Sequence, residues 1–314
     1  MREGLLSVVV PAYNEEQMIP KTAETIENIL SQARIAHEII FVDDGSKDRT
    51  WDCIRTAAAA DPHVRGIHFS RNFGKESAMF AGLAGAQGDC TAVIDCDLQH
   101  PPEKLPEMYA LWQQGFEVIA GVKSNRGKES VLHGAAARLF YRLMGGSAGF
   151  GMQNASDFKL LDRDAVEALL QMPERHAFFR ALSAWIGFKT ASVSFEVQER
   201  PHGQSKWSAY ALVKYAVTNI ASFSTAPMQV VTFLGMLMFV ISVILGIVSV
   251  TQKIMGVALG GFTTVIILLL FIGSIIMISL GIIGFYISQI YEEVKMRPRY
   301  IIASECGNIP DKEK

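Results

Sequence analysis

The chain has 314 residues, 50% of them hydrophobic, and a formal net charge of only −2. This composition is apolar for a soluble enzyme, and the charge balance gives no reason to expect a nucleic-acid partner. The four cysteines show no Cys-x-x-Cys spacing, so we expect reduced thiols in a reducing compartment.

The first two hundred residues alternate short apolar runs with segments of helical periodicity, which predicts an α/β domain around a mostly parallel sheet. Helices are expected at residues 17–33, from about residue 48, and at residues 76–86, where small side chains allow close packing. Strands are expected at residues 6–10, 38–42, 64–69, 91–94 and 158–161.

Two carboxylates stand where the fourth strand leaves the core. Asp95 and Asp97 follow an apolar run and precede Pro101 and Pro102, which stop regular structure. If the backbone stays extended, both side chains point the same way, and their repulsion is most simply offset by Mg²⁺ or Mn²⁺ carrying phosphate oxygens. A loop with two solvated aspartates is the alternative, because Asp-x-Asp is common. His100, close by, is most simply a solvated loop histidine, with a helper role near the metal as the alternative.

Polar clusters also follow the first two strands, at residues 13–15 and at Asp43 and Asp44. In an open α/β sheet, ligands bind at the carboxyl ends of the strands, so the three clusters are expected to meet in one crevice. Carboxylates there can accept hydrogen bonds from a base or a ribose, while the pair beyond the fourth strand holds a metal against a diphosphate. A nucleotide diphosphate is the ligand that this arrangement favours.

The second half of the chain contains two long uncharged stretches. No Asp, Glu, Lys or Arg occurs at residues 215–252 or 254–291. Two membrane spans are the natural interpretation, and a pair of buried helices in a large soluble core is the alternative. The N-terminal apolar run is too short for a signal peptide, so the globular part is expected in the cytoplasm. Lys295, Arg297 and Arg299 favour a cytoplasmic tail as well.

These observations predict six segments along the chain. In order, they are a cytoplasmic catalytic domain at residues 1–205, an interfacial juxtamembrane helix at 206–227, a first transmembrane helix at 228–250, a short external loop at 251–261, a second transmembrane helix at 262–287, and a cytoplasmic tail at 288–314. Glycines in both spans permit close helix approach, so a homo-oligomer is plausible.

Several ordered motifs carry a resemblance to a known family. Residues 10–15 (VPAYNE), 42–46 (VDDGS), 71–75 (RNFGK) and 95–99 (DCDLQ) resemble family 2 glycosyltransferases of the GT-A fold, a Rossmann-like architecture. Residues 156–163, Arg200 with 203–206, and 222–227 are similar to the narrower group of polyprenyl-phosphate glycosyltransferases. That group includes bactoprenol glucosyltransferases and dolichol-phosphate mannose synthases. The resemblance spans nearly the whole chain and mildly supports a tetramer.

The resemblance implies inverting transfer of a sugar from a nucleotide sugar, most simply a UDP-sugar, to a polyprenyl phosphate. Undecaprenyl phosphate is the expected acceptor in a bacterium, at the cytoplasmic face of the inner membrane. Mg²⁺ or Mn²⁺ is the implied cofactor. Which sugar is transferred is not marked by any pattern in the sequence.

The roles that it implies fall into four groups. The nucleoside is held by Pro11, Ala12, Tyr13, Glu15 and Asp43, and the metal by Asp97, with Asp95 contacting donor or metal. The diphosphate is met by Gln99, Arg200 and Lys206, the last two on a mobile loop, and Asp95 and Arg200 also count as catalytic. Asp157 matches a position proposed as the general base, although it could equally orient the acceptor or complete the metal site.

A basic segment at residues 123–142 offers cations for the lipid phosphate. Arg126 and Arg138 are the candidates, and contact with anionic headgroups is the alternative for both. Two other functions stay open for the chain: a catalytically silent nucleotide-binding scaffold or flippase partner, and a processive polysaccharide synthase. The second is the weaker, because the Gln-x-x-Arg-Trp sequence of such synthases is absent here.

Overall fold

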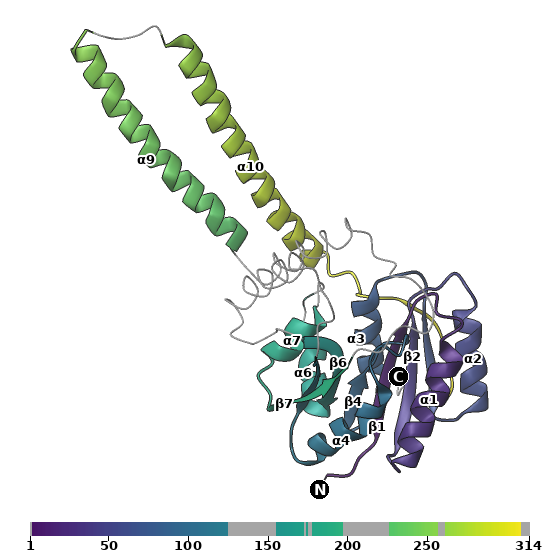
Figure 1. Cartoon of the computed structure of the whole chain (residues 1–314). Coiled ribbons are helices and arrows are strands. Elements are labelled where there is room, and N and C mark those ends of the chain that lie inside the picture. Colours follow the sequence, from purple (N-terminus) through teal and green to yellow (C-terminus); the bar gives the residue numbers. More distant parts are fainter. Residues whose placement is uncertain are drawn as a thin grey trace. The chain divides into compact units, whose positions relative to one another are not determined.

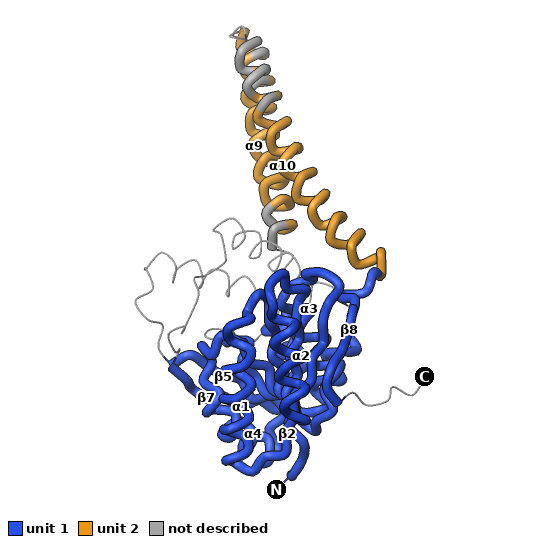
Figure 2. Tube along the Cα trace, turned by 90° about the vertical axis from the view of Figure 1, so that its right-hand side faces the viewer, with its two compact units in different colours: residues 1–141, 148–207, 297–314 blue, residues 142–147, 208–296 orange. Residues whose placement is uncertain are grey.

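The computed structural model describes residues 2–124, 155–172, 174, 178–196, 226–256 and 261–308. The chain divides into two compact units, which we treat separately (Figure 2). The first comprises residues 1–141, 148–207 and 297–314, and the second residues 142–147 and 208–296. The predicted interfacial helix at residues 206–227 lies almost wholly outside the described residues.

The first unit is built on a mixed sheet with the strand order β7-β5-β6-β4-β1-β2-β3-β8 (Figure 1). Its members are β1 (Leu6–Ala12), β2 (His37–Asp43), β3 (Val64–Phe69), β4 (Cys90–Val93), β5 (Val118–Lys123), β6 (Ala155–Asp162), β7 (Thr190–Phe195) and β8 (Ile302–Cys306). The pairs β1–β2, β1–β4, β2–β3 and β5–β7 are parallel, whereas β6 and β8 pair antiparallel with their neighbours. The predicted mostly parallel sheet is thus confirmed.

Helices cover both faces of this sheet. They are α1 (Ile19–Gln32), α2 (Thr50–Ala60), α3 (Lys75–Gly85), α4 (Leu105–Gln113) after the short helix η1 (Pro102–Lys104), α6 (Arg163–Leu170) and α7 (Phe179–Trp185). Val8 and Val10 of β1 share a core with α1 and α4, while Val9 faces the other way, toward α3. Alternation along a buried parallel strand explains why every residue of β1 is buried.

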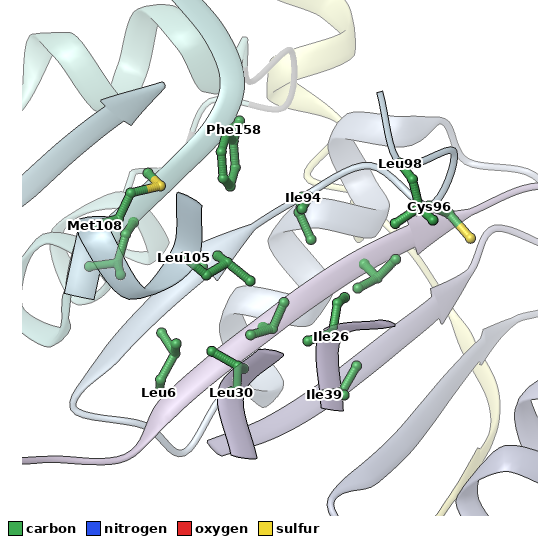
Figure 3. Close-up of a cluster of buried hydrophobic side chains, with 14 of the residues drawn as sticks. Leu6, Ile26, Leu30, Ile39, Ile94, Cys96, Leu98, Leu105, Met108 and Phe158 are labelled. Atoms are coloured by element: carbon green, nitrogen blue, oxygen red, sulfur yellow. The ribbon is translucent and has the colours of Figure 1, made fainter. Parts of the chain in front are cut away.

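Local sequence explains how the helices meet the sheet. In α1 the buried residues Ile19, Ala23, Ile26 and Leu30 recur at helical spacing and form part of the main core (Figure 3). In α3 the helix lies so close to β1 that a Cβ on Gly82 would stand 2.1 Å from Val9 Cγ1. The small residues of α3 therefore serve close packing, as predicted.

The five predicted strands and three predicted helices are all present, with ends displaced by at most a few residues. The sequence patterns do not predict β5, β7 or β8. The last of these lies beyond the second apolar helix and pairs antiparallel with β3, so the predicted tail contributes an edge strand to the sheet of the first unit.

The second unit contains two long apolar helices, α9 (Ala226–Ile254) and α10 (Phe262–Val294). Within them, Val231–Gln252 and Phe271–Val294 are long and apolar enough to cross a membrane. Neither segment is buried within the described structure, and large side chains such as Phe233 and Met277 are 69% exposed. Among the described residues, these segments therefore lack the burial that the alternative, core helices in a large soluble domain, requires.

Candidate active site

The acidic pair follows β4 on a segment anchored in the core. Ile94, Cys96 and Leu98 are buried in the main hydrophobic cluster, whereas Asp95 and Asp97, which alternate with them, are half-buried (Figure 3). The Thr22 hydroxyl donates to the Cys96 carbonyl at 2.8 Å, which ties the segment to α1. The extended backbone that the predicted metal site assumed is not present, because Cys96 and Asp97 form a turn and Leu98 has a φ of 56°. Both carboxylates nevertheless lie beyond β4, at the carboxyl end of the parallel strands.

A lysine links this pair to β6. Lys75 begins α3, and its Nζ lies 2.6 Å from Asp95 Oδ1 and 2.9 Å from Asp157 Oδ2. Burial disfavours the charge on this amine, but Asp95 and Asp157 more than offset that effect and hold the pKa of Lys75 above its usual range. The ammonium consequently bridges two carboxylates that lie far apart in the sequence.

Asp157 has a second cationic partner. Arg180 of α7 donates from Nε to Asp157 Oδ1 at 2.7 Å and from a terminal nitrogen to Oδ2 at 3.0 Å. Burial alone would raise the pKa of the Asp157 carboxyl, but Lys75 and Arg180 reverse this and hold it well below its usual range. Asp157 is therefore ionised at neutral pH and a weak proton acceptor.

Glu76 extends the contacts between α3 and α7. The backbone N–H of Phe179 donates to its Oε2 at 3.0 Å. Burial, together with the neighbouring Asp157, raises the pKa of Glu76 to about 7, against the opposing effects of that N–H, Lys75 and Arg180. This carboxyl is thus a group beside the site that titrates near neutrality.

The turn after β2 holds its two carboxylates differently. Asp43 is fully buried and accepts hydrogen bonds from the backbone and hydroxyl of Ser46 and from His68 Nδ1, the last at 2.7 Å. Asp44 accepts from the backbone N–H groups of Phe73 at 2.6 Å and Gly74 at 2.9 Å. The turn is thereby joined to the loop that precedes Lys75.

Burial raises the pKa of Asp44 to about 6, in spite of the N–H groups of Phe73 and Gly74, and the nearby Asp43 adds to the rise. The Asp44 carboxyl is therefore a structural group whose ionised form is destabilised by its surroundings.

The loop after β1 is fixed to the same region. Pro11 and Ala12 are buried, and Tyr13 and Glu15 are half-buried. The N–H of Asn14 donates to Ser46 Oγ and that of Glu15 to Thr50 Oγ1, each at 2.8 Å. The predicted nucleoside residues thus come from the ends of β1 and β2 and from the loop after β1, which is hydrogen-bonded to Ser46 and Thr50.

His100 is not the solvated loop residue that the sequence suggests. Its ring is 7% exposed and stacks on Phe158 at 5.4 Å between centroids, with Phe195 edge-on at 5.5 Å. Its Nδ1 lies 3.7 Å from Asp95 Oδ2. Burial lowers the pKa of His100, although Asp95 opposes the change, so the ring is mostly neutral at pH 7. The expectation was wrong because two aromatic side chains enclose the ring.

The structure brings most of the predicted site residues to one edge of the sheet, and four lie outside the described residues: Arg126, Arg138, Arg200 and Lys206. Lys75 and Arg180 are absent from the predicted site. Lys75 stands in the RNFGK motif, which could have identified it. Arg180 belongs to no recognised motif, and only the fold brings it to Asp157.

The class of protein follows from these features. A mostly parallel Rossmann-like sheet with an acidic pair beyond β4 defines a domain of the GT-A type. Comparison with known proteins gives the family, because residues 7–170 match the sequence model described as Glycosyl transferase family 2. The chain belongs to glycosyl transferase family 2 and is a glycosyltransferase.

Relatives match along almost the entire chain. The prophage bactoprenol glucosyl transferase homolog of Escherichia coli (strain K12) is 38% identical over 299 residues, covering 95% of this chain and 98% of the relative. The bactoprenol glucosyl transferase of Shigella phage SfII is 38% identical over 306 residues, covering 96% and 99%. A solved structure titled as a mycobacterial protein shares the fold, with a TM-score of 0.50 and 20% identity over 69% of this chain and 72% of that one.

Proposed function

We propose that this glycosyltransferase moves a sugar from a nucleotide sugar, most simply a UDP-sugar, to a polyprenyl phosphate, with inversion at the anomeric carbon. The observation that carries the proposal is the match to proteins named bactoprenol glucosyl transferases over at least 95% of the chain, both apolar helices included. These names make glucose the first sugar to test and undecaprenyl phosphate the first acceptor. Helices able to cross a membrane suit an acceptor that resides there.

The acidic pair suits a divalent cation. Carboxylate oxygens are the ligands that Mg²⁺ and Mn²⁺ prefer, and Asp95 and Asp97 offer them two positions apart on a segment tied to α1. Asp95 Oδ1 is buried, and its partner is the ammonium of Lys75 at 2.6 Å. We therefore assign the metal to Asp97 and Asp95. A cation there would offset the charge that develops on the leaving diphosphate.

Asp157 is proposed as a positioning residue. A polyprenyl phosphate is a monoester whose second pKa is about 6, so it is mostly a dianion at neutral pH and needs no strong base. The lowered pKa of Asp157 also makes it a poor base. Its carboxylate instead fixes Lys75 and Arg180, and both cations then face the place where two negatively charged phosphates must approach.

The remaining roles rest on the family resemblance. They are nucleoside binding by Pro11, Ala12, Tyr13, Glu15 and Asp43, diphosphate binding by Gln99, Arg200 and Lys206, and acceptor binding by Arg126 and Arg138. A cytoplasmic catalytic domain, a multi-pass inner-membrane location and a homo-oligomer belong to the same proposal.

The test is sugar transfer by the purified full-length chain. Radiolabelled UDP- and GDP-sugars are offered in turn with undecaprenyl phosphate and Mg²⁺ or Mn²⁺, and EDTA and Asp97→Asn serve as controls. We expect one donor to give a lipid-linked product that both controls abolish. If folded protein binds UDP but forms no product from any donor, the proposed reaction is wrong and a silent nucleotide-binding role gains support.

A further inference from the structure

A second group of metal-ligating side chains lies at the opposite edge of the sheet from the acidic pair. His37 is the first residue of β2, His63 directly precedes β3, and Glu27 comes from α1. One ligand atom from each lies within 4.8 Å of the other two. Because β2, β3 and β4 run parallel within one sheet, the amino ends of β2 and β3 lie at the opposite end of the strands from the carboxyl end of β4.

The hydrogen bonding of His37 determines which of its nitrogens is available. Its Nδ1 lies 2.8 Å from the carbonyl oxygen of Ile35, and a carbonyl can only accept, so Nδ1 carries the proton. In a neutral ring, Nε2 then has a lone pair, and that atom lies 2.7 Å from Glu27 Oε2. Two electron-rich atoms at this distance repel one another unless a positive charge accompanies them.

The other ligands are held in a similar way. Ser31 Oγ donates to Glu27 Oε1 at 2.7 Å, which leaves Oε2 directed at the histidines. The carbonyl of His63 accepts from the Ile39 N–H at 2.8 Å, so the backbone at His63 is fixed to β2. Outer hydrogen bonds that orient the ligands are typical of metal sites.

We propose that Glu27, His37 and His63 form a site for a divalent transition-metal ion, with zinc as the first candidate. Two imidazole nitrogens and a carboxylate oxygen are a common zinc ligand set, and they differ from the all-oxygen set of the acidic pair. His63 Nδ1 lies 3.5 Å from Glu27 Oε2, close to the roughly 3.4 Å between ligands of a tetrahedral ion bound at about 2.0–2.2 Å. His37 Nε2 is only 2.7 Å from the same oxygen, so these two side chains must move apart when the ion binds.

The cluster is partly open to solvent, and a further carboxylate lies beside it. The side chain of His63 is 49% exposed, and Asp61 Oδ1 lies 3.1 Å from His63 Nδ1. Asp61 or water can therefore complete the coordination. A bound ion would join α1 to the starts of β2 and β3, and we expect it to stabilise the first unit without touching the acidic pair.

The experiment is a calorimetric zinc titration of the full-length chain in saturating Mg²⁺, which occupies sites made of oxygen ligands alone. We expect one zinc per chain, with affinity lowered at least about 10-fold in His63→Gln and in Glu27→Gln. Glu24→Gln, on the exposed face of the same helix, is the matched control and should bind as the wild type does.

X-ray absorption of the zinc complex and melting temperatures complete the test. The spectrum should show nitrogen and oxygen ligands, and zinc should raise the melting temperature of the wild type but not of His63→Gln. The proposal would be overturned if zinc did not bind, if both ligand variants bound zinc as tightly as the wild type, or if the spectrum showed a cysteine sulfur ligand. A proton on His37 would then be the charge beside Glu27.

Discussion

The turns after β2 and β4 each place two carboxylates at the carboxyl end of a strand that neighbours β1, yet the two pairs are held in opposite ways. Asp43 and Asp44 are 0% and 3% exposed and accept hydrogen bonds from neighbouring loops. The Asp95 side chain is 25% exposed and meets the ammonium of Lys75. Residue type and place in the sheet are the same, but the surroundings differ.

The difference shows how a carboxylate acquires its role. The donors to Asp44 are backbone N–H groups, which are fixed by the fold, so Asp44 holds two loops together as a structural residue. A lysine side chain can move, so the charge beside Asp95 can be exchanged for another cation. We infer that Asp44 shapes the site and that the pair after β4 takes part in the chemistry.

The largest effect should come from Asp97→Asn. Loss of the principal metal ligand removes charge compensation for the leaving diphosphate, and we expect transfer to fall about 10³-fold. The melting temperature should change little, because Asp97 is only half-buried and lies in the turn after β4. Initial rates and melting curves measure both effects, with the exposed Glu103→Gln as the control. If Asp97→Asn transferred sugar at the wild-type rate, Asp97 would not be the principal metal ligand, and the functional difference between the two turns would not hold.

Arg180→Met should give the next largest effect. It removes a bidentate partner from the buried Asp157 while Lys75 remains, and we expect a loss of about 2–3 kcal/mol in stability. Arg55→Met, which removes an exposed pair with Asp52, should cost less than about 0.5 kcal/mol. Chemical denaturation in detergent compares the two. Equal losses of stability in the two variants would mean that the pair of Asp157 with Arg180 does not stabilise the fold as we propose.

Asp44→Asn tests the buried turn through pH. The folded-state pKa of Asp44 is about 6 and the ordinary value is 3.8, so the folded state binds this proton more tightly than the unfolded state does. Wild type should therefore gain stability relative to Asp44→Asn as the pH falls from 7 to 4, by roughly 2 kcal/mol. Melting temperatures across this range measure the gap, with the exposed Asp52→Asn as the control. If the difference in stability between wild type and Asp44→Asn did not change with pH, the raised pKa of this buried carboxyl would be contradicted.

The smallest effect is expected from His100→Phe. The new ring keeps the stacking on Phe158, and the 3.7 Å from Nδ1 to Asp95 Oδ2 is too long for a hydrogen bond. Transfer should change less than about threefold, or roughly 0.7 kcal/mol. Rate measurements over a range of Mn²⁺ concentrations check this. A loss that extra Mn²⁺ restores would instead make His100 a helper at the metal.

Local patterns were sufficient for much of the fold. Helical spacing in α1 and the apolar runs of β1 to β4 predicted elements that the structure confirms, because each pattern reflects burial of one face or of a whole strand. The edge strand β8 was missed, since its sequence, Ile302–Cys306, lacks a buried run and depends on pairing with β3.

The site was predicted less completely, because its contacts join distant parts of the chain. Lys75 and Asp157 are 82 positions apart, and Arg180 reaches Asp157 from a short helix without a motif. No local pattern encodes such meetings. The same limit explains His100, which looked like a polar loop residue until Phe158 was placed beside it.

The measurement that separates the two turns most directly is Mn²⁺ binding in the presence of UDP, followed by electron paramagnetic resonance on the full-length chain. Wild type and Asp44→Asn should each bind one Mn²⁺, whereas Asp97→Asn should lose it at the same concentrations. If Asp97→Asn binds Mn²⁺ as the wild type does, the metal does not lie at the turn after β4, and the contrast drawn between the two turns is wrong.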